Sequence, residues 1–111
     1  MSTNGKPDLA HRIQDAMSAL GSTRAGVAGT LAVGRYRGTR HDGHRCPVAR
    51  FLKRRIGESL FVTTSAVRRG ADSAFICKPP TCVARFVAAF DDGEYPWMEE
   101  DDDRRLPRPR A

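Results

Sequence analysis

The sequence predicts a small α+β domain with the element order α-(α)-α-β-(β)-β-α and a short antiparallel sheet. Three observations lead to this prediction. Apolar residues recur at helical spacing in four segments, of which the second is weak. β-Branched and aromatic residues gather between the third and fourth of these segments, as in strands. The length of 111 residues suits one domain with a single modest core.

The first two helices are expected in the N-terminal third of the chain. Asp8 can cap a first helix, and Gly21 is expected to end it as a C-terminal cap. The apolar face of this helix consists of Leu9, Ile13, Ala16, Met17 and Leu20. Ser22 or Thr23 is expected to start a second helix that runs to Val33, and this helix is weaker because each of its two internal glycines costs about 1 kcal/mol relative to alanine.

The third helix is expected to begin at Cys46-Pro47, after a polar loop over residues 34–45, because proline is favoured at the first helical position. Gly57 is expected to end it. Strands are then predicted over residues 60–64 and 74–77, with a shorter one around 66–68.

The fourth helix carries the clearest apolar pattern in the chain. Val83, Phe86, Val87 and Phe90 recur at the spacing of one helix face. Thr81 is expected to cap this helix, and Gly93 to terminate it.

The flanks differ from the body in composition. Residues 1–7 form a polar lead-in without a hydrophobic signal core, residues 8–98 form the single domain, and residues 99–111 form a charged tail. The five consecutive carboxylates of Glu99–Asp103 repel one another, so the tail is expected to be disordered. An alternative is that the tail folds back on the basic body and competes with an anionic partner.

Charge divides unevenly along the chain. Residues 1–90 carry 15 Lys or Arg against 5 Asp or Glu, and residues 91–111 carry 4 against 8, which together give +6. A basic body indicates either affinity for a polyanion or a solvated surface. The dominance of arginine is also typical of a GC-rich genome. The candidate nucleic-acid contacts are Arg35, Arg37, Arg40, Arg45, Arg50, Lys53, Arg54, Arg68 and Arg69.

The element order resembles that of a winged helix-turn-helix. In that interpretation Pro47–Ile56 is the reading helix and Arg68-Arg69-Gly70 a basic wing tip. The first residues of a reading helix must reach base edges, but here they are Pro47, Val48 and Ala49, which cannot hydrogen-bond to bases. We therefore expect a weak binder that contacts phosphates without sequence preference.

Two segments resemble those of small hypothetical proteins of actinobacteria. One is the Cys-Pro-Val-Ala-Arg-Phe-Leu run of residues 46–52, and the other is the closing helix with its Phe-Asp-Asp-Gly-Glu-Tyr-Pro extension, residues 83–96. The resemblance implies the architecture and a bacterial cytoplasmic setting, and it implies no activity.

Enzyme chemistry is not expected. Five possible zinc ligands occur: His41, His44, Cys46, Cys77 and Cys82. The His-x2-His pair falls outside the usual ligand spacing, and Pro79-Pro80 lies inside the Cys77/Cys82 loop, so no metal or other cofactor is predicted. Cys46 would lie at a helix N-terminus beside cations, which lowers a thiol pKa. Without an orienting base, however, it is interpreted as a partly buried helix cap.

Residues 8–98 contain no glycine-rich phosphate loop and no paired carboxylates suited to acid/base chemistry. Asp91 and Asp92, which lie together near a helix end, are expected to be solvated. Three cysteines without an export signal predict reduced thiols and a cytoplasmic protein. No apolar run reaches the roughly 18–20 residues of a membrane span, so no membrane partner is expected.

The competing interpretation is a protein–protein adaptor without a nucleic-acid role. Its contact surface would be the segment Tyr95-Pro96-Trp97-Met98, because Trp, Tyr and Met are enriched in interfaces. Alternatively, these residues close the core over the last helix.

Overall fold

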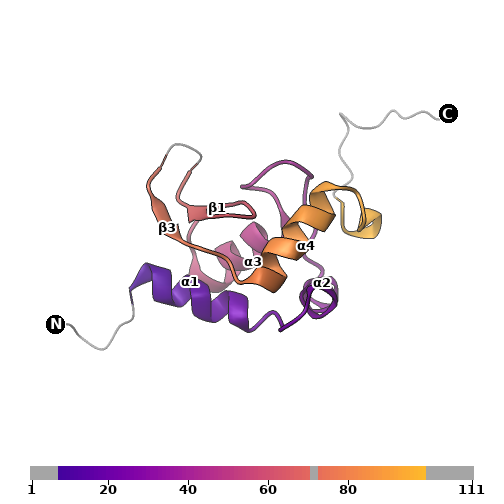
Figure 1. Cartoon of the computed structure of the whole chain (residues 1–111), viewed down its shortest axis with the longest axis horizontal. Coiled ribbons are helices and arrows are strands. Elements are labelled where there is room, and N and C mark those ends of the chain that lie inside the picture. Colours follow the sequence, from indigo (N-terminus) through magenta and orange to yellow (C-terminus); the bar gives the residue numbers. More distant parts are fainter. Residues whose placement is uncertain (1–7, 71–72, 100–111) are drawn as a thin grey trace.

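The computed structural model describes residues 8–70 and 73–99 (Figure 1). It confirms a small α+β domain, which combines α-helices with a three-stranded antiparallel sheet. The predictions for residues 1–7 and for residues 100–111 lie outside the described residues. The elements are α1 (Leu9–Ser18), α2 (Arg24–Val33), α3 (Pro47–Ile56), β1 (Phe61–Val62), β2 (Val67–Arg68), β3 (Phe75–Cys77), α4 (Thr81–Asp91) and the 3-10 helix η1 (Pro96–Met98).

Local capping groups start the first two helices, as the sequence predicts. A carboxylate oxygen of Asp8 accepts a hydrogen bond from the backbone N–H of His11 at 2.9 Å, and the Thr23 hydroxyl accepts one from Gly26 at 3.0 Å. The prediction that Gly21 caps the end of α1 is wrong, because α1 ends at Ser18. Gly21 instead has φ +141° and lies so close to Gly26 that a Cβ would be 3.0 Å from its carbonyl carbon.

The predicted start and end of α3 are confirmed. The Cys46 sulfur accepts a hydrogen bond from the Ala49 N–H at 3.3 Å, Pro47 is the first helical residue, and Gly57 ends the helix with φ +91°. Thr81, in contrast, does not cap α4. It is the first residue of the helix, and Pro80 stands at the cap position without a side-chain hydrogen bond.

The sheet is shorter than the sequence pattern predicts. Its strand order is β1-β2-β3, both pairs are antiparallel, and Val62 lies opposite Val67. The Thr63 hydroxyl accepts hydrogen bonds from the N–H groups of Ser65 and Ala66, at 3.3 and 3.1 Å. This turn ends β1 after two residues.

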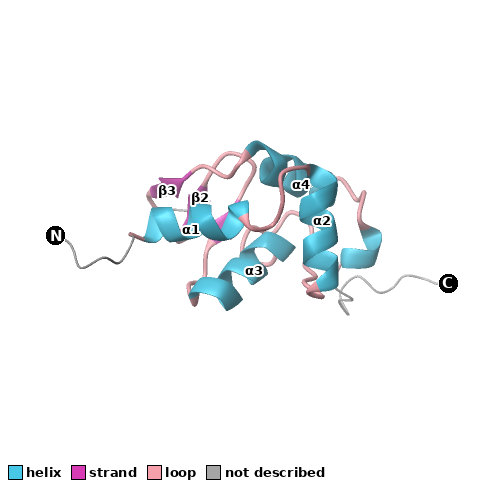
Figure 2. Cartoon of the chain, turned by 90° about the horizontal axis from the view of Figure 1, so that it is seen from below, coloured by secondary structure: helices cyan, strands magenta, loops and turns pink. Residues whose placement is uncertain are grey.

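The core lies between the helices and the inner face of the sheet. α1 packs along α3 and β3, and α2 packs along α4 (Figure 2). Phe86 and Phe90 of α4 are fully buried and stack with ring centroids 6.0 Å apart. The sheet lies at one end of the domain and η1 at the opposite end (Figure 1). Within the described residues, no helix is long and apolar enough to cross a membrane.

Candidate nucleic-acid interface

The exposed face of α3 carries a group of cations. Val48, Phe51 and Leu52 bury one side of the helix, while Lys53 and Arg54 are exposed on the other. Arg50 is half-buried and lies on the same face, because residues three and four apart are neighbours on a helix. Across residues 8–70 and 73–99, neither Lys53 nor Arg54 makes an ion pair. Their charge is therefore open to an external anion.

The last turn of α3 adds a cation that the sequence-based site omitted. The Arg55 guanidinium lies 5.6 Å from the centre of the Phe51 ring, four residues earlier, and the side chain is exposed. The i, i+4 spacing of Phe51 and Arg55 was the signal that could have found this contact. Arg12 of α1 donates a hydrogen bond to the Ile56 carbonyl at 3.4 Å, so it too lies at this end of α3.

The loop before α3 carries cations that are partly neutralised. Arg40 Nε lies 3.5 Å from a carboxylate oxygen of Glu99, and Arg45 Nε lies 3.9 Å from one of Asp42. Arg37 donates a hydrogen bond to the Glu99 main-chain carbonyl at 3.1 Å. Arg35 is exposed and makes no ion pair with any residue that the structure describes.

One acidic side chain holds this loop in place. Asp91, at the end of α4, accepts a hydrogen bond from the backbone N–H of His41 at 2.8 Å, where His41 has the left-handed φ of +61°. The expectation that Asp91 is simply solvated is therefore wrong, because its carboxylate is half-buried and anchors the loop.

The two arginines of the expected wing tip are both engaged in contacts within the domain. Arg68 donates to the Ser73 carbonyl at 2.9 Å, across the turn between β2 and β3. Arg69 forms an ion pair of 2.6 Å with Glu58, just after α3. The structure thus brings Arg69 to the end of α3 but does not present Arg68 and Arg69 as an open pair.

The N-terminal residues of α3 cannot read bases. Pro47, Val48 and Ala49 are all buried in the core. A reading helix presents these positions to the groove of DNA. The arrangement is therefore unsuited to sequence-specific recognition in the manner of a helix-turn-helix.

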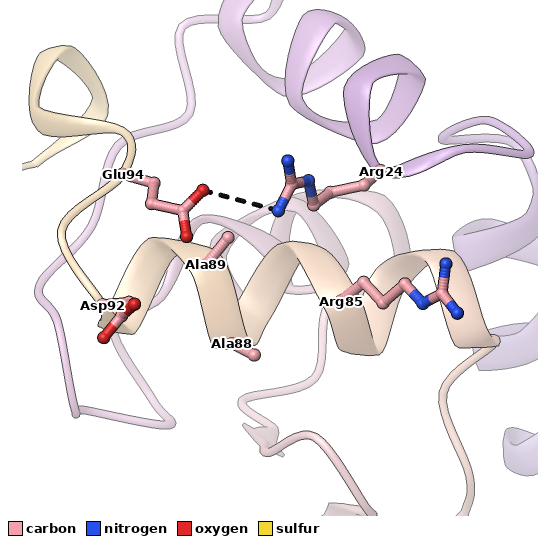
Figure 3. A pocket seen from close by; sticks show the side chains of 6 residues that line it. All are labelled: Arg24, Arg85, Ala88, Ala89, Asp92 and Glu94. Atoms are coloured by element: carbon pink, nitrogen blue, oxygen red, sulfur yellow. Dashed lines mark hydrogen bonds and ion pairs between the residues drawn. The ribbon is translucent and has the colours of Figure 1, made fainter.

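A charged groove lies between α2 and α4, apart from the α3 face (Figure 3). It has a volume of about 470 Å³, and its lining residues are Arg24, Arg85, Ala88, Ala89, Asp92 and Glu94. Arg24 and Glu94 form an ion pair of 3.4 Å across it. Because its cations and carboxylates offset each other, this groove is a weaker candidate for a polyanion than α3.

The thiol of Cys46 does not have the lowered pKa that its place at a helix N-terminus predicts. Burial raises its pKa to about 12, and this outweighs the hydrogen bond from Ala49, which lowers it. The alternative interpretation, a buried helix cap, describes the structure. Among the described residues, no three His, Cys, Asp or Glu side chains are placed to hold a metal ion.

The segment after α4 divides between core and surface. Met98 is buried, and the half-buried Tyr95 packs on Phe86 with ring centroids 5.1 Å apart, so these two residues close the core. Trp97 is 62% exposed. It borders a groove of about 330 Å³, whose other lining residues are Ala32, Arg35, Tyr36, Arg37 and Met98.

Comparison with known proteins adds no relative to these observations: no family model, no curated protein and no solved structure matches this chain.

Proposed function

We propose that this protein is a non-enzymatic accessory or regulatory protein of the bacterial cytoplasm that binds nucleic acid weakly and without sequence preference. The observation that carries the proposal is the exposed face of α3, where Lys53 and Arg54 have no carboxylate partner among the described residues. Arg55, in the last turn of the same helix, adds exposed positive charge.

Few exposed cations lack an ion-pair partner among the described residues, and this limits the expected affinity for nucleic acid. Each neutralised phosphate releases counterions, so a few contacts give binding that is strong only at low salt. Side chains that contact phosphate position a protein without reading sequence. The burial of Pro47, Val48 and Ala49 removes the usual source of base readout.

The test is a pair of charge-matched double variants. Lys53→Gln/Arg54→Gln removes two cations from α3, and Lys78→Gln/Arg85→Gln removes two exposed cations from outside α3. The α3 variant should bind all duplexes and single strands more weakly. Its slope of log affinity against log salt should flatten by about one unit per lost contact.

The control variant should keep the parent's slope, because its charges do not belong to the α3 face. Equal losses in both variants would show that bulk charge alone attracts the polyanion. No binding to any nucleic acid at low salt would end the proposal.

The second candidate function is a protein–protein adaptor. The exposure of Trp97, at 62%, favours it, because tryptophan is enriched in protein interfaces. This function would stand alone if nucleic acid did not bind.

A further inference from the structure

The groove beside Trp97 is built from two segments that are distant in the sequence. The Gly38 N–H donates a hydrogen bond to the Met98 carbonyl at 2.9 Å, and Gly38 and Glu99 form a parallel bridge. No side chain fits at Gly38, because a Cβ there would collide with the Arg45 carbonyl. The loop before α3 is thus fastened to η1.

Trp97 presents a large aromatic surface at this groove. It is 62% exposed, although the neighbouring Met98 is buried and fixes the end of η1. The ring of Tyr95 contacts Trp97 at an angle of 80°, with centroids 5.5 Å apart. This edge contact orients the indole while more than half of its surface stays open.

The charges that line the groove have one sign. Arg35 and Arg37 are exposed, and the described lining residues include no carboxylate. Arg35 has the left-handed φ of +62°, which is uncommon for a residue with a side chain. A groove that is lined by an exposed aromatic ring and two arginines matches a ligand that is both flat and anionic.

One aromatic contact links the groove to α3. Tyr36 lines it and packs edge-on against Phe51 of α3, with ring centroids 5.5 Å apart. Arg55 lies over the same Phe51 ring, with its guanidinium 5.6 Å from the ring centre, whereas Lys53 and Arg54 lie on the other side of α3. A strand that places one base at Trp97 can therefore extend toward Arg55.

We propose that this groove binds one unpaired nucleobase of a single-stranded nucleic acid, with the base stacked on Trp97 and the flanking phosphates at Arg35 and Arg37. The inference rests on the proposed function, and it names single strands as the preferred class. Stacking tolerates any base, because every base has a π-face. In a duplex both faces of a base are already covered.

The chain contains one tryptophan, so intrinsic fluorescence reports on this site directly. The full chain is titrated at low salt with a thymidylate 12-mer, with an abasic sugar-phosphate 12-mer and with a duplex of equal charge. The thymidylate strand should quench Trp97 and bind about tenfold more tightly than the abasic strand. Because the Trp97 variants lack this fluorophore, their binding is followed by the anisotropy of dye-labelled strands. Trp97→Ala should remove that preference, and Trp97→Phe should keep most of it.

Phe75→Ala is the matched control, because Phe75 is an exposed aromatic residue on the sheet, 55% exposed. It should bind like the parent. Circular dichroism melts establish that each variant is folded, and Arg35→Gln tests the same groove without touching the aromatic residues. Arg35→Gln should weaken the binding of both single strands.

The outcomes separate the two proposals. If the strands bind but Trp97→Ala behaves like the parent, the stacking site is overturned while phosphate binding at α3 stands. Equal affinity for thymidylate and abasic strands overturns it as well. If no nucleic acid binds, both proposals end.

Discussion

At the scale of single residues, Cys46 shows how burial decides between opposing effects. Its sulfur accepts the Ala49 N–H at the start of α3, which stabilises a thiolate. The side chain is only 2% exposed, and the loss of hydration outweighs that hydrogen bond, so the pKa rises to about 12. The sequence identified the cap but could not show how deeply it is buried.

The raised pKa of Cys46 predicts a loss of stability in alkali. The unfolded thiol ionises near pH 9 and the folded one near pH 12, so the neutral form favours the folded state. This contribution is complete below pH 9 and is lost as the pH rises from 9 to 12. Urea unfolding at pH 8 and 10 should show a larger loss for the parent than for Cys46→Ala, by about 1 kcal/mol. Equal losses would show that Cys46 does not contribute.

At the scale of elements, α4 contributes two large and fully buried side chains, Phe86 and Phe90, to the core. Phe86→Ala should cost about 3–5 kcal/mol, because it removes a fully buried ring that contacts Phe90 and Tyr95. Arg85→Ala, on the exposed side of the same helix, should change the free energy of unfolding by less than about 0.5 kcal/mol. Chemical denaturation of both variants measures the difference, and a similar midpoint for the two would contradict the packing of α4.

The element boundaries that the sequence predicted correctly depend on local chemistry. Asp8 and Thr23 each accept a hydrogen bond from the N–H group three residues later. Such a short spacing can be recognised in the sequence. Gly21 was misassigned because its conformation is set by the close approach of Gly26 in the next helix. β1 is short because the Thr63 turn replaces further strand pairing.

The candidate site likewise has one part that the sequence predicts and another part that depends on nonlocal contacts. The cations of α3 share a face by helical periodicity, which the sequence shows. The pairing of Arg40 with Glu99 and of Arg69 with Glu58 brings together residues 59 and 11 positions apart. The open groove beside Trp97 depends on the same nonlocal contact between the loop and η1, so no short pattern could predict it.

At the scale of the whole molecule, the first residue of the acidic run Glu99–Asp103 contacts the basic loop that precedes α3. Glu99 is its first residue; its side chain is 16% exposed and pairs with Arg40, while its carbonyl accepts a hydrogen bond from Arg37. Four more carboxylates follow in the sequence, residues 100–103. Four residues span at most about 14 Å, so these charges remain within reach of the loop.

This placement predicts that the acidic run competes with nucleic acid for the loop and the Trp97 groove. Deletion of residues 100–111 removes four carboxylates and four arginines, so the net charge stays at +6. A gain in affinity therefore cannot come from bulk charge. The shortened chain should bind a single strand about tenfold more tightly at low salt, and the gain should shrink as salt screens the competitor.

Deletion of residues 104–111 alone provides the control. It removes the four arginines and keeps the carboxylates, so it should bring no gain. Fluorescence titration of the three chains with the thymidylate 12-mer measures these differences. If the 100–111 deletion binds no more tightly than the full chain, the carboxylates do not occupy the binding surface. In that case the contacts of Glu99 serve only to fasten the loop to η1, and the affinity of the domain is set by its open cations and Trp97.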